Sequence, residues 1–108
     1  MTVSYFALYR TPEDPEEFER HYFGSHVPLV EQVPGLLENR VQRVKRQFLG
    51  EPGYYLLAEL VFESAEAMKQ AFASPEWAAS GTDLRSWGGI DLATGFTAEP
   101  YRPQNPGA

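Results

Sequence analysis

His26 is one of two histidines in the 108-residue chain, and it lies two residues before Pro28. An imidazole with a pKa near ~6.5 accepts or donates a proton at neutral pH, as the isomerisation of an enolisable carbonyl compound requires. The alternative is a buried histidine whose ring bonds to backbone carbonyls that Pro28 leaves free. His21, beside Glu17 on the charged face of the same segment, is expected to be an ordinary helix histidine.

Glu59 is the second candidate for a catalytic role. It lies among apolar residues on one face of a strand-like segment, where a carboxylate is costly to bury unless it is paired or protonated. One interpretation is a general base of raised pKa, or a group that orients His26. We favour the other, in which Glu59 forms an ion pair with Arg43 or Arg46 on the neighbouring strand.

Aromatic residues and one arginine are the candidates for substrate binding. A flat ligand would pack against aromatic rings, and Arg43 would clamp an anionic group on it. The alternatives are core packing for the rings and solvated charge at a sheet edge for the arginine. The candidates are Tyr5, Tyr22, Arg43, Tyr55 and Trp87. We expect no metal site, because two histidines five residues apart do not share a helix face.

The elements that position these residues follow from periodicity and from the glycines and prolines between them. Strands are expected at 3–10, 36–48, 54–62 and 90–99. Helices are expected at 15–33, interrupted near Pro28, and at 64–73, with a short piece at 75–79 ended by Gly81. Residues 82–87 are expected to form a further turn of helix or a loop. The order β-α-β-β-α-β predicts an α+β, ferredoxin-like fold with a four-stranded antiparallel sheet.

The expected sheet has two largely apolar faces, and the helices cover only one of them. We therefore predict a homodimer in which two sheets pack face to face as a dimeric α/β barrel and enclose a space. Residues 1–108 are expected to form a single domain, with an irregular tail from about residue 100.

Composition limits the kinds of partner that the chain can bind. The net charge of −6 argues against nucleic-acid binding, and no apolar run is long enough to span a membrane. The chain has no cysteine and lacks a secretory signal at its start, so we expect a cytoplasmic protein.

Two groups of residues resemble the signatures of one family. The first is Phe18-x3-Tyr22-x3-His26-x-Pro28-Leu29 followed by Pro34-Gly35-Leu36; the second is Ala58-Glu59-Leu60-x-Phe62-x-Ser64 with Ser74-Pro75-Glu76 and Asp83. Together they resemble the EthD-type (ethyl tert-butyl ether degradation) family. The resemblance implies membership of the dimeric α/β-barrel superfamily, which includes muconolactone-type isomerases, aromatic polyketide cyclases and cofactor-free monooxygenases.

The residues and the resemblance together suggest a cofactor-free isomerase or cyclase. It would act on a small hydrophobic or aromatic carbonyl compound in a degradative or secondary pathway, with His26 as the acid and base and Glu59 as its partner. The alternative is a non-catalytic ligand-binding or accessory protein for a degradative oxygenase. The enzyme requires His26 to reach the cavity, whereas the carrier does not.

Overall fold

A computed structural model describes residues 1–101, and the predicted tail beyond Tyr101 lies outside them. The strands are β1 (Val3–Arg10), β2 (Leu36–Arg43), β3 (Tyr54–Phe62) and β4 (Ala93–Ala98). The helical elements are α1 (Pro15–His21), a π-helix (Tyr22–His26), α2 (Val27–Val30), α3 (Ala65–Phe72), α4 (Pro75–Ser86) and a 3₁₀-helix (Gly89–Leu92).

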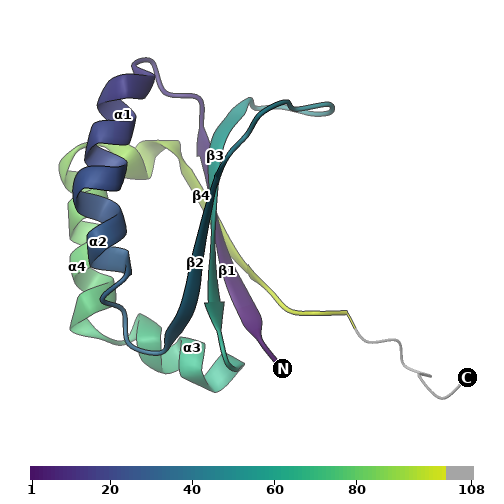
Figure 1. Ribbon diagram of the computed structural model, residues 1–108, viewed down its shortest axis with the longest axis vertical. Helices are drawn as coiled ribbons and strands as arrows, with labels where there is room; N and C mark the ends of the chain where they lie inside the picture. The colour runs from purple at the N-terminus through teal and green to yellow at the C-terminus, as the bar shows by residue number, and fades with distance from the viewer. Residues whose placement is uncertain (102–108) are drawn as a thin grey trace, which may run out of the picture.

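The strands form one antiparallel sheet in the order β2-β3-β1-β4. This is the predicted ferredoxin-like α+β fold. Figure 1 shows the helices on one side of the sheet and no element over the other side. The core lies between the helices and the sheet. Its strand residues include Ala7, Tyr9, Leu56, Ala58, Leu60 and Phe62.

The predicted interruption of the first helix takes the form of a π-helix. The helix begins as expected, with the Asp14 side chain accepting from the Glu17 N–H and proline at the first position. Because Pro28 has no N–H, a regular α-helical bond to Gly24 cannot form. The N–H of Val27 instead donates to the carbonyl of Tyr22, five residues earlier. The wider π-helical turn accommodates the proline without breaking the helix. His26 is the last residue of this turn and is buried.

The second strand is shorter than the predicted 36–48 and ends at Arg43. The N–H of Val44 still bonds to the Tyr55 carbonyl. Beyond Val44, hydrogen bonds from one side chain take the place of the backbone hydrogen bonds between β2 and β3. The amide group of Gln47 donates to the carbonyls of Leu49, Gly50 and Pro52 and accepts from the N–H of Tyr54. The β2–β3 connection is therefore held by one glutamine, and it bends away from the helices (Figure 1).

The predicted break at Gly81 was wrong, because α4 continues to Ser86. Ser74 caps the helix as expected, with its hydroxyl accepting from the Trp77 N–H at 3.1 Å. A glycine inside a helix costs about 1 kcal/mol relative to alanine. Here burial of Ser80 and Leu84, on either side of Gly81, outweighs that local preference.

The last strand is also shorter than the predicted 90–99, because residues 89–92 form a 3₁₀-helix. Gly88 precedes it in the left-handed region, with φ of 84°. Within β4, a Cβ at Gly95 would overlap the hydroxyl of Tyr5. The glycine that weakens the strand pattern therefore makes room for a tyrosine of β1.

The far face of the sheet carries alternate side chains of β1 and β3 with their neighbours. We call it the bare face; it is formed by Ser4, Phe6, Leu8, Leu57, Glu59, Val61 and Phe96. Phe6 stacks on Phe96, with ring centroids 5.6 Å apart. Within residues 1–101, no helix is both long and apolar enough to cross a membrane.

Candidate functional site

A cavity of about 230 Å³ lies between the sheet and the helices of a single chain. Its floor is formed by the helix-facing residues of β1 and β3, and its roof by α4 and the π-helix. Most of its wall is buried and apolar, while Arg85 and Ile90 are exposed and mark its mouth. The polar or titratable residues on the wall are Tyr5, Tyr9, Tyr22, His26, Asn39, Ser80 and Arg85.

One stripe of α4 forms much of the roof. Trp77, Ser80, Gly81, Leu84 and Arg85 all line the cavity. Residues at these intervals of three and four share one face of an α-helix. The unbroken helix therefore brings five wall residues to the cavity, including an arginine.

His26 is 6% exposed and faces a carboxylate from α4. Its Nδ1 lies 3.4 Å from Oδ2 of Asp83, but among the described residues that nitrogen has no well-aligned hydrogen bond. The same carboxylate oxygen accepts a hydrogen bond from Nε1 of Trp87 at 3.1 Å. Asp83 is thus held by the indole, with its charge beside the imidazole.

Burial lowers the pKa of His26 below its ordinary value of 6.5, because the protein interior disfavours the charged ring. The carboxylate of Asp83 and the backbone of Ser80 act in the opposite direction and favour the protonated ring. Since burial is the larger effect, the imidazole is neutral at pH 7. A neutral ring with its proton on Nδ1, toward Asp83, presents Nε2 as a base.

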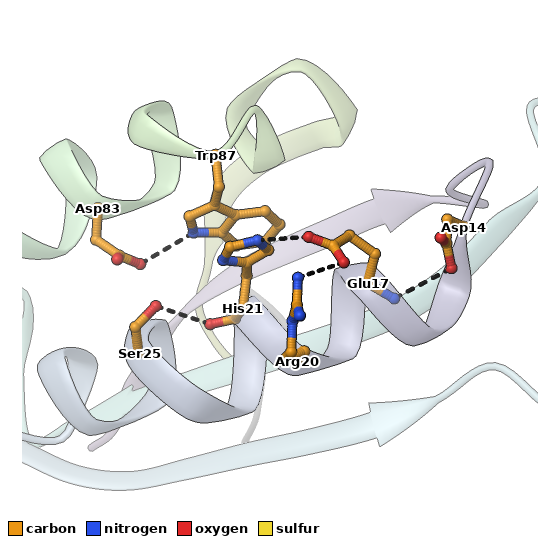
Figure 2. A network of polar contacts seen from close by, with 7 residues as sticks. All are labelled: Asp14, Glu17, Arg20, His21, Ser25, Asp83 and Trp87. Carbon is orange, nitrogen blue, oxygen red and sulfur yellow. Dashed lines mark hydrogen bonds and ion pairs between the residues drawn. The ribbon is translucent and has the colours of Figure 1, made fainter.

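Figure 2 shows that the indole of Trp87 lies against the side chain of His21 from α1. The ring of His21 stacks on its indole with centroids 5.1 Å apart and planes inclined by 10°. His21 in turn bonds through Nε2 to Glu17 at 2.9 Å. His21 therefore supports the indole that holds Asp83, and it does not line the cavity.

Two tyrosine hydroxyls of the wall remain protonated at neutral pH. Burial raises the pKa of Tyr9 and of Tyr22 well above the ordinary value of 10.0. Each is therefore a neutral hydrogen-bond donor. Asn39 adds an acceptor, since its amide oxygen is buried and has no hydrogen-bond partner within the described part of the chain. Residues 1–101 hold no cluster of three or more histidine, cysteine, aspartate or glutamate side chains suited to a metal ion.

Comparison with known proteins identifies the family. The family model of the EthD domain matches residues 10–87. The chain belongs to the EthD family. It is 36% identical over 92 residues to an uncharacterized 11.0 kDa protein encoded in the thcB-thcC intergenic region of Rhodococcus erythropolis, covering 85% of this chain and 89% of that one.

Solved structures show the same family and fold. An EthD family protein of Bacillus halodurans superposes with a TM-score of 0.85 at 36% identity, covering 94% of this chain and 100% of that one. SnoaB, a cofactor-independent oxygenase from Streptomyces nogalater, superposes with a TM-score of 0.61 at 21% identity, covering 97% of each chain. A dimeric ferredoxin-like protein from Jannaschia has a TM-score of 0.70 at 16% identity, covering 93% of this chain and 100% of that one.

In this EthD protein the cavity brings together three of the residues predicted from the sequence, Tyr5, Tyr22 and His26. Trp87 does not line the cavity; it donates a hydrogen bond to Asp83, which in turn faces His26. The structure does not bring Glu59 to His26, because Glu59 lies on the bare face, across the sheet from the cavity. There it accepts from the Ser4 hydroxyl at 2.7 Å and approaches Arg40 at 3.5 Å.

Arg43 and Tyr55 also lie outside the cavity. Arg43 donates both ends of its guanidinium to Glu19 of α1, at 2.8 and 2.6 Å, and the Tyr55 hydroxyl donates to the same carboxylate. The ion pair of Glu59 with Arg43 or Arg46 is therefore not formed; Arg40 is the residue directly opposite Glu59 in the sheet. Tyr55 has no partner on β1, so the alternation of β3 shifts there and turns the ring toward α1.

Among the wall and near-wall residues that were not predicted as site residues, three are used in the proposals below: Asp83, Asn39 and Arg85. The signal for Asp83 and Arg85 was present in the spacing from Trp77 and Ser80, but it required α4 to continue through Gly81. Asn39 shares its strand face with Val41, and this alternation places it toward the helices. Nothing in its local sequence distinguishes it from a surface asparagine.

Proposed function

We propose that this EthD protein transfers a proton on a small hydrophobic or aromatic carbonyl compound bound in the cavity, in an isomerisation or cyclisation. The observation that supports it most is His26, a buried and neutral imidazole on the wall of an apolar cavity with a carboxylate behind it. A base on the wall of such a cavity supports a role in general acid–base catalysis.

The proposed steps use only groups of this chain. Nε2 of His26 removes a proton from the carbon next to the carbonyl, and the enolate oxygen accepts hydrogen bonds from neutral tyrosine hydroxyls of the wall. Asp83 stabilises the imidazolium that forms. The same ring then returns the proton to a different carbon, or the enolate attacks a second carbonyl of the substrate and the ring protonates the new alkoxide.

The size of the cavity supports a compact substrate. A cavity of roughly 150 Å³ holds benzene, and pockets for drug-sized ligands are roughly 300–1,000 Å³. At about 230 Å³, this one suits a single substituted ring. SnoaB, which has the same fold, is a cofactor-independent oxygenase, so the fold accommodates small-molecule chemistry without a cofactor in that protein.

Deuterium exchange tests the proposal without knowledge of the natural substrate. Phenylacetone, a neutral aryl ketone, is incubated in D₂O, and the loss of its α-proton signals is followed by NMR. We expect His26→Gln to slow the protein-dependent exchange by about 100-fold or more. His21→Gln, at the half-exposed histidine, acts on His26 only through Trp87 and Asp83 and should slow the exchange much less. Unchanged exchange in a folded His26→Gln protein excludes the role, and binding of the ketone without exchange in the wild type supports the carrier.

We also propose that two copies pair through their bare faces. Exposed or half-exposed Phe6, Leu57 and Phe96 form an apolar surface there. The Jannaschia protein of the same fold is dimeric, which supports this arrangement. Pairing through this face would leave the cavity inside each copy, on the other side of the sheet.

A further inference from the structure

Arg85 is the cation on the cavity wall, and its guanidinium lies over a glycine of its own helix. A Cβ at Gly81 would come within 3.3 Å of Nη1 of Arg85. The missing side chain therefore leaves the space in which the guanidinium lies at the cavity mouth. This arrangement accounts for a glycine inside α4, where other residues would favour the helix by up to about 1 kcal/mol.

Four other arginines have oxygen partners within the protein, and Arg46 lies over the Phe48 ring. Arg20, Arg40 and Arg43 each form an ion pair with a glutamate, and Arg10 donates to the backbone carbonyl of Asp91. In residues 1–101, Arg85 forms neither a salt bridge nor a side-chain hydrogen bond. A guanidinium carries five donors in a planar fork that fits a carboxylate. Those donors point to an anionic group from outside the chain.

A structural explanation for Arg85 is its place in the last turn of α4, where a cation interacts favourably with the helix dipole. Lys69 also lies in the last turn of its helix, α3, and it does not line the cavity. The dipole does not explain why Arg85 lines the cavity or why the position one turn before it is a glycine. Lys69 therefore provides a control for the dipole effect.

Asn39 of β2, on the sheet side of the cavity, presents a second polar group that a ligand would have to satisfy. Its buried amide oxygen accepts no hydrogen bond within the described residues, and such an acceptor costs about 1–3 kcal/mol when it is left unpaired. A hydroxyl donor on the ligand would satisfy it. The wall between Asn39 and Arg85 consists mainly of aromatic and aliphatic side chains.

We propose that the carbonyl compound taken by the cavity carries a single hydroxylated aromatic ring and a carboxylate. Its carboxylate binds Arg85 at the mouth, and its hydroxyl donates to Asn39. The ring lies along the apolar wall that also holds His26. This substrate class rests on the proposed function of the same cavity. The carboxylate stays half in solvent at the mouth, so binding avoids the large cost of burying a charge.

Three probes of similar shape test the two contacts separately: 4-hydroxybenzoate, 4-hydroxybenzamide and 4-methylbenzoate. Affinities are measured by NMR titration of the full chain. We expect 4-hydroxybenzoate to bind at least about tenfold more tightly than the amide, because a charge-assisted pair is lost in the amide. Arg85→Gln should bring that ratio close to one. Lys69→Gln, which removes a last-turn cation elsewhere, should preserve it.

The hydroxyl contact has its own comparison. The wild type should prefer 4-hydroxybenzoate to 4-methylbenzoate by about fivefold or more, and Asn39→Leu should remove this preference. A wild type that binds none of the probes, or that does not discriminate between acid and amide, overturns the proposal. So does an Arg85→Gln protein that keeps the preference for the acid. None of these measurements involves turnover, so they fail or succeed separately from the exchange of phenylacetone that tests His26.

Discussion

At the scale of single residues, one carboxylate oxygen links the buried and exposed histidines. Oδ2 of Asp83 accepts from the Trp87 indole and lies 3.4 Å from Nδ1 of His26. The indole stacks on His21, which Glu17 holds from the surface. The charge beside the imidazole is therefore positioned by a chain of contacts that begins outside the cavity.

Asp83→Asn should lower the pKa of His26 further. The amide keeps an acceptor for the indole but removes the charge that favours the protonated ring, so only burial and the Ser80 backbone remain. We expect the pKa of His26 to decrease, as measured by NMR titration of the imidazole signals. Glu17→Gln keeps the charge of Asp83 and acts only through His21 and Trp87, so it should change the pKa of His26 less than Asp83→Asn does. An unchanged or higher pKa of His26 in Asp83→Asn contradicts the assignment of Asp83 as its electrostatic partner.

At the scale of elements, α4 contains a glycine of low helix propensity, Gly81, at a position that lines the cavity. Gly81→Ala should raise the free energy of unfolding by about 0.5–1 kcal/mol through helix propensity. The new methyl group would lie 3.3 Å from Nη1 of Arg85 and push the guanidinium by a few tenths of an ångström, so 4-hydroxybenzoate should bind about threefold or more weakly. Urea unfolding and NMR titration measure the two effects.

Gly24→Ala is the matched control, because a Cβ at this exposed helical glycine would contact nothing within 4 Å. It should leave binding unchanged. If Gly81→Ala binds the probe as tightly as the wild type does, the glycine is not there to seat the guanidinium.

A second element-scale feature joins the β2–β3 hairpin to α1. The Arg43 guanidinium and the Tyr55 hydroxyl lower the pKa of Glu19 from 4.5 to about 2. A carboxyl with a lower pKa in the folded state adds stability above its unfolded pKa and loses it as the pH falls. Glu19→Gln should therefore be less stable than the wild type at pH 7, and the difference should shrink between about pH 4.5 and pH 2.

Thermal unfolding at several pH values checks this window. Tyr55→Phe keeps the ion pair with Arg43 but removes the hydroxyl donor, so the pKa of Glu19 should rise part of the way toward 4.5. The pH range over which Glu19 adds stability should then become narrower. A stability difference for Glu19→Gln that stays constant across the acid range would count against the pair.

At the scale of the whole molecule, the proposed pairing of two copies depends on the bare face. Leu57→Glu places a charge in the middle of this face and should shift the protein from dimer to monomer in light scattering after gel filtration. Phe23→Glu puts the same charge on the exposed phenylalanine of the helical layer and should leave the dimer intact. A dimer that persists in Leu57→Glu at micromolar concentration places the interface elsewhere.

The sequence predicted the elements best where they are bounded by strong local signals. Val3–Arg10 and Tyr54–Phe62 were predicted to the residue, since Pro12 follows the first run and Pro52 and Gly53 precede the second. Alternation also grouped Glu59 with Leu57 and Val61, but it could not tell which face would meet the helices, since both faces are apolar. For that reason Glu59 was considered as a partner of His26, although it lies across the sheet.

The rest of the site depended on packing between distant segments. The continuation of α4 past Gly81 is set by burial against the sheet and not by its own residues, so Asp83 and Arg85 could not be placed. The turn of Tyr55 toward α1 follows from one extra residue in β3 opposite β1, which no alternating pattern reveals. His26 was recognised because Pro28 forces an irregularity locally.

The sheet separates the cavity from the bare face, and this separation bears on how a pair of molecules would respond to ligand. Pairing through the bare face adds no residue to either cavity wall, so each copy would fill without reference to its partner. Saturation would then be hyperbolic, with a Hill coefficient of one. Diluting the protein until the pairs dissociate would leave the half-saturating ligand concentration where it was.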